Sequence, residues 1–169
     1  GWVLIYVASY VFWTVCYILT AKYNSREFLF RFVAADLLSR TICGVIFVVI
    51  PTTNIRPEFP IDGFCDWLLQ MIYALDLPYN LFPSIHCLVS LMCYLGIRKC
   101  SQIKPVAKWS ILIFVLLVCV STQFTKQHYI VDVIGGILVA LVSFEAGMET
   151  DLYKPVEKIF SRINRAVFG

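Results

Sequence analysis

The chain has 169 residues, of which 60% are hydrophobic and only 15% are charged, and its mean hydropathy is +0.79. Soluble domains are about half apolar and a quarter charged, so this composition excludes a soluble multidomain enzyme and an intrinsically disordered chain. The net charge of +3 is small and the basic residues form no single stripe, which excludes a nucleic-acid partner. We therefore predict an all-α, polytopic bundle of helices in a membrane.

The apolar segments, taken in chain order, predict five membrane-spanning helices and one short interfacial helix. The predicted spans are residues 2–21, 32–50, 84–97, 106–124 and 129–148. The span at 84–97 is short, so we expect it either to extend through Arg98 or to begin deeper, in a recess lined by protein. The apolar stretch 64–75 is too short to cross a membrane and is interpreted as a re-entrant or interfacial helix.

The basic residues of the connecting segments predict the orientation, because cytoplasmic loops are enriched in Lys and Arg. Three segments rich in these residues are expected on the cytoplasmic side: 22–31, 98–108 and 154–165. The segment 51–83 instead has four acidic residues and a single basic one, Arg56. The turn 121–128 has Lys126 as its one charged residue. Both of these segments are therefore expected on the extracytoplasmic side.

The C-terminal segment 149–169 alternates apolar and basic residues. This pattern is typical of an amphipathic helix that lies on the inner leaflet, and a solvated basic tail would have a similar composition. We expect residues 1–148 to form the transmembrane catalytic domain and residues 149–169 to form this cytoplasmic tail.

Ionisable groups inside spans are costly and are usually functional or paired. Asp36 and Arg40 lie four residues apart, so we predict an ion pair along one helical face. The alternative that these two residues line a cavity stays open. His128 and Asp132 are also four apart, at the outer start of the last span. His86 lies at the outer start of the 84–97 span, so the two histidines of the chain are expected at the same depth.

Two imidazoles and a carboxylate at one depth can supply a nucleophile, a group that orients it and a proton donor. Each residue taken alone also has a structural explanation, because histidine is a common interfacial anchor and an acid in the first turn stabilises a helix. Donors and cations suited to a phosphate surround them in the sequence: Arg56, Ser84, Ser121 and Lys126. A metal site of His86, His128 and Asp132 is less favoured, because no further ligand has suitable spacing, so we expect no metal and no cofactor.

These motifs resemble those of the type 2 phosphatidic acid phosphatase superfamily, over residues 51–147. The superfamily's Pro-Ser-Gly-His motif is similar to Pro-Ser-Ile-His at 83–86. Its second signature, Ser-Arg, five residues, His, three residues, Asp, is similar to residues 121–132, with Thr122 at the Arg position. The opening Lys, six residues, Arg-Pro motif departs further, since Val49 stands where Lys is expected before Arg56.

The resemblance implies a metal-independent phosphatase in which His128 attacks phosphorus, Asp132 orients His128, and His86 protonates the leaving alcohol. Arg56 and Lys126 would replace the two missing cations. The substrate would be a lipid phosphate, bound at the extracytoplasmic side of the cell or plasma membrane. The family core usually has six spans, so a sixth span is expected upstream of residue 2.

Three alternatives to the phosphatase stay open. Ile85 in place of Gly resembles the Pro-Ser-Leu-His motif of the inositol phosphorylceramide synthase branch, which favours a lipid phosphotransferase. A binder of lipid phosphate without catalysis is possible, although it has little need for the two histidines and Asp132. A proton-coupled transporter would use Asp36, Arg40 and Asp132, but the sequence lacks an evident repeat. The sequence does not indicate an oligomeric state.

Overall fold

The structure is a computed structural model that describes residues 1–168, with side chains through residue 166, so the last residue of the predicted tail lies outside it. The described residues form seven α-helices and an isolated bridge between Thr53 and Tyr79. The helices are α1 (Trp2–Tyr23), α2 (Arg26–Val49), α3 (Phe64–Leu75), α4 (Ile85–Ile97), α5 (Pro105–Phe124), α6 (Ile130–Glu149) and α7 (Tyr153–Phe168). The prediction of an all-α helix bundle is confirmed.

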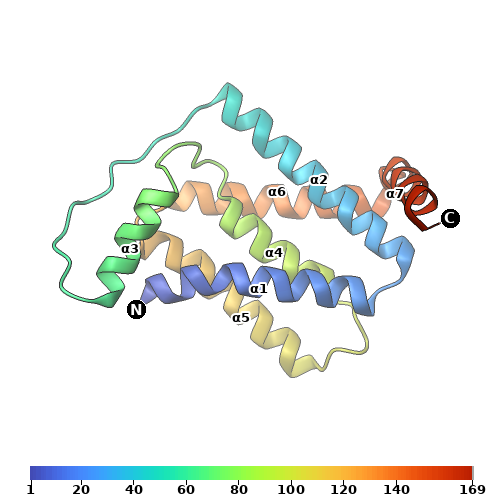
Figure 1. The fold of residues 1–169 in the computed structure, drawn as a ribbon, viewed down its shortest axis with the longest axis horizontal. Coiled ribbons are helices and arrows are strands. Elements are labelled where there is room, and N and C mark those ends of the chain that lie inside the picture. The colour runs from blue at the N-terminus through green and yellow to red at the C-terminus, as the bar shows by residue number, and fades with distance from the viewer. Residues whose placement is uncertain (169) are drawn as a thin grey trace.

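The short helix α4 lies at the centre of the bundle. It packs against α1, α5 and α6, while α2 packs against α6 and α7 (Figure 1). Figure 1 shows α3 across one end of the bundle and α7 at the opposite end. The molecule therefore has two distinct ends, and α3 marks the one toward which α4 and α6 direct their N-termini.

Four helices are long and apolar enough to cross a membrane: α1, α2, α5 and α6, with 20 to 24 residues each. The predicted span at 84–97 is instead the 13-residue helix α4, which rises about 20 Å against a hydrocarbon core of roughly 30 Å. The expected extension through Arg98 is wrong, because Arg98 is the C-cap of α4. Ten of the 13 residues of α4 are buried, so the helix is surrounded by protein. This agrees with the other expectation, that the segment begins in a recess lined by protein.

Small residues let α4 and α6 approach each other closely. A Cβ at Gly136 of α6 would collide with the carbonyl oxygen of Ser84 and meet the Cβ of Cys87 at 3.3 Å. The Ser84 N–H donates to the carbonyl of Asp132 at 2.9 Å, which joins the starts of the two helices. This contact fixes Ser84, two residues before His86, against the first turn of α6.

The predicted ion pair inside the bundle is confirmed. Arg40 Nη2 lies 3.3 Å from Asp36 Oδ1, and the Tyr17 hydroxyl donates to the same oxygen at 2.7 Å. Partners on both sides satisfy the carboxylate of Asp36, which explains how a charge is accommodated on α2. The pair lies outside the cavities that adjoin the two histidines.

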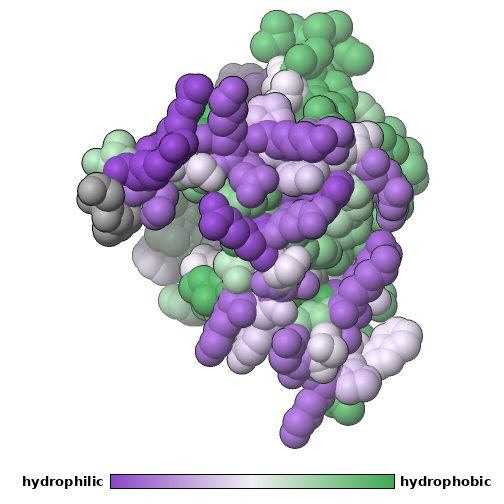
Figure 2. All heavy atoms as spheres, turned by 90° about the vertical axis from the view of Figure 1, so that its right-hand side faces the viewer, coloured by the Kyte–Doolittle hydropathy of each residue, from purple (hydrophilic) through white to green (hydrophobic). Residues whose placement is uncertain are grey.

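The end of the molecule that carries α7 is strongly polar. Figure 2 looks onto this end and shows hydrophilic side chains gathered across it, with apolar side chains along its flank. The described part of the tail forms the predicted amphipathic helix, whose Ile159, Phe160 and Ile163 stay about half exposed. Its position on a leaflet stays a prediction.

Candidate active site

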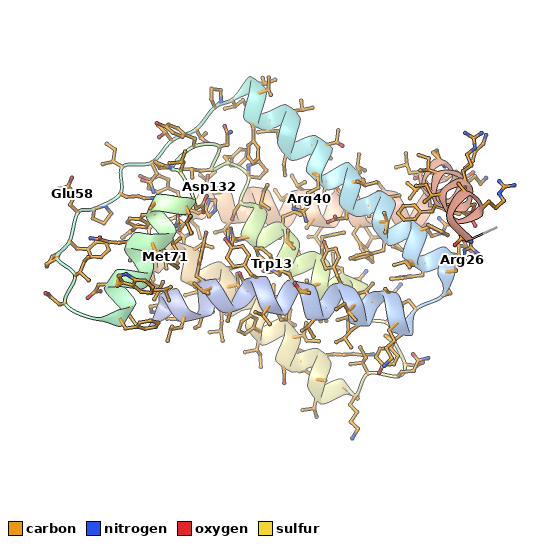
Figure 3. All side chains as sticks on the ribbon, in the orientation of Figure 1. Trp13, Arg26, Arg40, Glu58, Met71 and Asp132 are labelled. Carbon is orange, nitrogen blue, oxygen red and sulfur yellow. The ribbon has the colours of Figure 1, made fainter. Side chains whose placement is uncertain are left out.

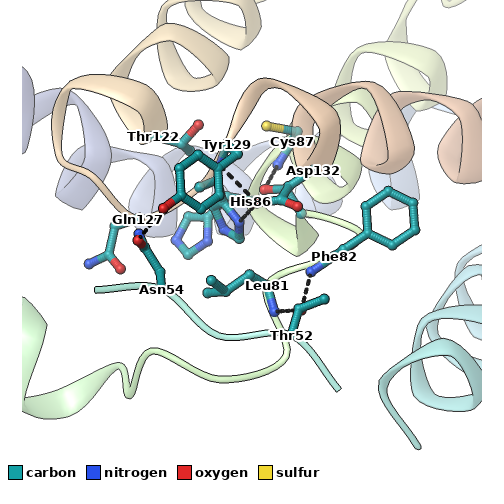
Figure 4. Close-up of polar contacts among 12 residues, drawn as sticks. Thr52, Asn54, Leu81, Phe82, His86, Cys87, Thr122, Gln127, Tyr129 and Asp132 are labelled. Carbon is teal, nitrogen blue, oxygen red and sulfur yellow. Dashed lines mark hydrogen bonds and ion pairs between the residues drawn. The ribbon is translucent and has the colours of Figure 1, made fainter. Parts of the chain in front are cut away.

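The opposite end of the bundle brings together His86, His128 and Asp132. His86 is in the first turn of α4 and Asp132 is in the first turn of α6 (Figure 4). His128 is in the connection from α5 to α6. The centroids of the two imidazole rings lie 6.2 Å apart. His128 Nδ1 lies 3.5 Å from Asp132 Oδ2, and Asp132 is only 3% exposed. The structure thus places the three predicted residues in one cluster.

The turn before His128 has a definite local geometry. Lys126 has a φ of 54°, in the left-handed region, and this residue ends the helical path of α5. The backbone N–H groups of Gln127 and His128 then both donate to the carbonyl of Thr122, at 3.0 and 3.2 Å. Asp132 Oδ2 accepts from the Tyr129 N–H at 2.8 Å, which closes the start of α6. These contacts fix His128 between two helix ends.

Arg56, a predicted phosphate ligand, is largely occupied by contacts within the protein. Its Nη1 donates to the carbonyls of Tyr73 at 3.1 Å and Asp76 at 2.5 Å, and its Nη2 donates to Gln127 Oε1. The guanidinium also lies over the Tyr73 ring, 4.6 Å from the centroid. Arg56 therefore holds the outer segment against α3 and against the residue before His128.

The outer segment is also tied to the site by Thr52 and Asn54. Thr52 Oγ1 accepts from the N–H groups of Leu81 and Phe82, at 2.8 and 3.0 Å (Figure 4). Asn54 accepts from the Tyr129 hydroxyl and donates to the Lys126 carbonyl, both at 2.8 Å. The outer segment is thus hydrogen-bonded to residues 81–82, which precede His86, and to residues 126 and 129, which flank His128. Figure 3 shows Glu58 farther out on this segment, away from Asp132.

Two predicted phosphate ligands, Ser84 and Ser121, have other partners. The Ser84 hydroxyl accepts from the Cys87 N–H as the N-cap of α4. The Ser121 hydroxyl donates to the Val118 carbonyl at 2.7 Å. Both side chains are buried and neither lines a described cavity, so this arrangement does not support the prediction that they bind phosphate. A short hydroxyl near a helix end readily bonds to the helix itself.

Two cavities of different character meet at His128. One, of about 480 Å³, is lined mainly by aromatic and apolar side chains together with His86, Gln127 and His128. Asp76 and Asn80 also line it, and the apolar part of its lining comes from Tyr10, Trp13, Phe47, Leu75, Tyr79, Leu81 and Ile85. The other, of about 430 Å³, is lined by Arg56 and the exposed Lys126 beside Asn54, Gln123 and Tyr129. The site can therefore receive a ligand that is apolar on one side and anionic on the other.

Several buried polar atoms of this cluster have no hydrogen-bond partner. They are Arg56 Nε, His86 Nε2, Gln127 Nε2 and His128 Nδ1. A buried polar group without a partner costs about 1–3 kcal/mol, and most buried polar groups in folded proteins have one. All four of these atoms belong to donor groups or to an imidazole able to donate, which suits the oxygens of an anionic ligand. Within residues 1–168, no group of three or more His, Cys, Asp or Glu side chains is arranged to hold a metal ion.

Sequence reasoning missed Tyr6, which contacts His86, and Asp76, which is hydrogen-bonded to Tyr6. Tyr6 of α1 is fully buried, its ring stacks on the His86 ring at 4.3 Å, and its hydroxyl donates to Asp76 Oδ2 at 3.0 Å. Asp76 was interpreted only as a charge of the outer segment. The aromatic residues Tyr6, Tyr10 and Trp13 recur at helical spacing, and this stripe is the signal that could have identified the α1 face beside the site.

Comparison with known families agrees with this geometry. The family model described as the PAP2 superfamily matches residues 2–146. The chain belongs to the PAP2 superfamily. No curated protein and no solved structure gives a significant match. Membership in the PAP2 superfamily supports phosphatase or phosphotransferase chemistry in general, whereas the predicted similarity to inositol phosphorylceramide synthases stays a prediction.

Proposed function

We propose that the chain is a lipid phosphate phosphatase that acts at the extracytoplasmic side of its membrane. It would hydrolyse a phosphomonoester or pyrophosphate of a lipid through a phosphohistidine at His128. The observation that carries this proposal is that His86 and His128 adjoin one cavity, with Asp132 beside His128. A phosphoryl group that contacts both rings fits the 6.2 Å separation of their centroids.

The first half of the reaction transfers the phosphoryl group to the enzyme. His128 Nε2 attacks phosphorus, the P–N bond forms and the P–O bond to the lipid alcohol breaks. Asp132, whose Oδ2 lies 3.5 Å from Nδ1, would accept a hydrogen bond from the protonated Nδ1 in the reacting complex and stabilise the positive charge on the ring. His86 Nε2, which has no partner in the protein, gives its proton to the departing alcohol.

The second half restores the enzyme. Neutral His86 accepts a proton from water, and the water oxygen attacks phosphorus as the P–N bond breaks. Orthophosphate leaves and His86 is again protonated. Lys126 and the Nε–H of Arg56 would stabilise the charge on the phosphoryl oxygens, so we expect turnover in the presence of a chelator.

The apolar cavity supplies the place for the lipid. Tyr10 and Trp13 of α1 and Phe47 of α2 line it, and α1 and α2 diverge toward this end of the bundle (Figure 1). An alkyl chain can enter from the membrane between these two helices, with its head group toward His128. The phosphate would then lie in the cationic cavity, where water can reach it.

A lipid phosphotransferase is the second candidate. The same phosphohistidine-type half-reaction would be followed by attack of an alcohol in place of water. The apolar cavity of about 480 Å³ beside His86 favours this candidate, because it offers room for an acceptor alcohol, and Ile85 forms part of its wall.

The test uses the purified protein and its His128→Ala variant in a chelator. Each is incubated with a panel of labelled lipid monophosphates and pyrophosphates, with and without a lipid alcohol. Orthophosphate from the parent and none from His128→Ala is the expected result. A new phospholipid without orthophosphate would support the phosphotransferase. Equal turnover by His128→Ala, with thermal unfolding unchanged, would refute the role of His128.

A further inference from the structure

The second histidine has a set of partners of its own. The Tyr6 hydroxyl lies 3.4 Å from His86 Nδ1 and 3.0 Å from Asp76 Oδ2. The Tyr6 and His86 rings are stacked, with 24° between their planes, so the phenol is held against the imidazole. Arg56 donates to the Asp76 carbonyl at 2.5 Å and thereby fixes the backbone of the acid. The three side chains form one line of contacts, His86, Tyr6 and Asp76.

The single proton of the phenol determines the direction of these bonds. A phenol donates one hydrogen bond, and an ionised carboxylate can only accept. Tyr6 therefore donates to Asp76, and its oxygen is left to accept from His86 Nδ1–H. The neutral imidazole then carries its proton on Nδ1, and its lone pair is on Nε2. His86 Nε2 is the buried nitrogen without a protein partner, and His86 lines the apolar cavity.

We propose that Tyr6 and Asp76 are positioning residues for His86, which hold it as the Nδ1–H tautomer and leave Nε2 to exchange the proton of the reaction. The inference rests on the proposed function, in which His86 Nε2 donates to the leaving alcohol and then accepts from water. Asp76 stabilises the positive charge of the His86 imidazolium through the hydrogen-bonded Tyr6. Asp132 stabilises the positive charge of His128 directly. Neither Tyr6 nor Asp76 loses or gains a proton in the cycle.

Among the other described groups around His86, none makes the hydrogen bond to the imidazole that Tyr6 makes. Tyr10 of α1 meets the His86 ring edge to face at 5.6 Å, and Trp13 lies 5.0 Å from it, without a hydrogen bond from either. From the α5–α6 connection, His128 faces His86 at 6.2 Å, with Asp132 beyond it. Asp76 is thus the carboxylate that reaches His86 through a hydrogen-bonded neighbour.

The tautomer of His86 can be measured without any turnover. The chain has two histidines, so the His128→Ala variant leaves His86 as the single source of imidazole signals. Long-range ¹H–¹⁵N spectra of this variant, labelled with ¹⁵N-histidine, distinguish a protonated Nδ1 from a protonated Nε2. We expect Nδ1–H in the His128→Ala protein. Adding Tyr6→Phe, which retains the stacked ring, should move the population toward Nε2–H.

The matched control is Tyr17→Phe in the same background. It removes a phenol hydroxyl from the same helix, and this hydroxyl also donates to a carboxylate, Asp36, at 2.7 Å. The His86 spectrum should be unchanged by it. An Nε2–H tautomer in the His128→Ala protein, or a spectrum that Tyr6→Phe does not change, would overturn the inference.

Kinetics of the protein with both histidines give the second readout. Tyr6→Phe and Asp76→Asn should each lower kcat about 10- to 100-fold for a lipid phosphate, with KM little changed, because general acid–base catalysis contributes about 10²–10⁴-fold. The loss should be much smaller for an aryl phosphate, whose leaving group needs no proton. Equal losses for both substrates would indicate a structural role and overturn the inference. A parent that turns over no lipid phosphate, but has the expected tautomer, would refute the proposed function alone.

Discussion

Asp132 combines a structural and a chemical contact in one carboxylate. Its Oδ2 accepts from the Tyr129 N–H at 2.8 Å and lies 3.5 Å from His128 Nδ1. The first contact fixes the beginning of α6, and the second places a negative charge beside the imidazole of His128. The orientation of His128 is therefore coupled to the start of the helix that follows it.

The variant Asp132→Asn separates these two contacts. The amide oxygen of Asn can still accept from Tyr129 N–H, so we expect the melting temperature to change little. The amide cannot stabilise a positive charge on His128, so we expect kcat to fall about 10²–10⁴-fold. Glu58→Gln, which neutralises an exposed acid of the outer segment, is the control and should leave kcat unchanged. A kcat for Asp132→Asn close to that of the parent would contradict the role of the carboxylate.

Lys126 is the cation of the site that has no competing protein partner among the described contacts, and its backbone conformation limits which residue can replace it. Asn tolerates a φ of 54°, so Lys126→Asn removes the charge without straining the turn. A hydrogen bond to a charged group contributes about 1.5–3 kcal/mol, so KM for a lipid phosphate should rise roughly 10- to 100-fold. Lys99→Asn, at the opposite end of the molecule, should leave KM unchanged. An unchanged KM in Lys126→Asn would mean that this cation does not contact the phosphate.

At the scale of the elements, the site depends on how closely α6 approaches α4. Gly136 lies against the Ser84 carbonyl, and Ser84 immediately precedes the turn that contains His86. A methyl group there would push apart the two helix starts that hold His86 and Asp132. The separation of the two imidazoles is therefore set by a residue that contacts neither of them.

The variant Gly136→Ala tests this dependence. Overpacking a close contact typically costs about 1–3 kcal/mol, so we expect a lower melting temperature in detergent and a large loss of turnover. Gly44→Ala is the matched control, because Gly44 is also inside a long helix but has no atom within 4 Å of an added Cβ. It should keep its turnover and be equally or slightly more stable, since Ala favours a helix over Gly by about 1 kcal/mol. Full activity in Gly136→Ala would show that the helices can separate without harm.

Hydropathy predicted the helices that face lipid more reliably than the one surrounded by protein. The ends of α1, α5 and α6 lie within two residues of the predicted spans, because a lipid-facing helix needs a long apolar run, whereas α2 begins at Arg26, six residues before the predicted start. Helix α4 is apolar for another reason, namely burial on all sides, so its composition alone did not reveal that it is too short to span.

The same distinction applies to the site. His128 and Asp132 are four residues apart, and this spacing predicted that they lie together, although His128 precedes the N-cap of α6 and is not part of the helix. The contacts of Tyr6 with His86 and with Asp76 join residues 80 and 70 positions apart, and no local pattern encodes them. The phosphate-binding roles of Ser84 and Ser121 stay predictions, which the structure does not support because a serine near a helix end can bond to its own backbone, as Ser121 does.

At the scale of the whole molecule, the two ends differ in charge and in chemistry. The histidine cluster lies at the end covered by α3 and the acidic outer segment. The opposite end carries α7 with its Lys and Arg side chains, and Figure 2 shows the polar surface there. Because basic segments are retained in the cytoplasm, this asymmetry predicts that the site faces the extracytoplasmic side.

Cysteine labelling in sealed vesicles of defined orientation tests this prediction. Of the seven native cysteines, Cys65 is the one that is not buried, so Cys65→Ser provides a background in which the native thiols react little with the label. Asp62→Cys and Glu149→Cys each replace an exposed acid, one at each end of the molecule. With the extracytoplasmic face outward, an impermeant maleimide should label Asp62→Cys at once and Glu149→Cys only after permeabilisation. The reverse pattern would place the histidine cluster on the cytoplasmic side, and substrate would then have to come from the inner leaflet.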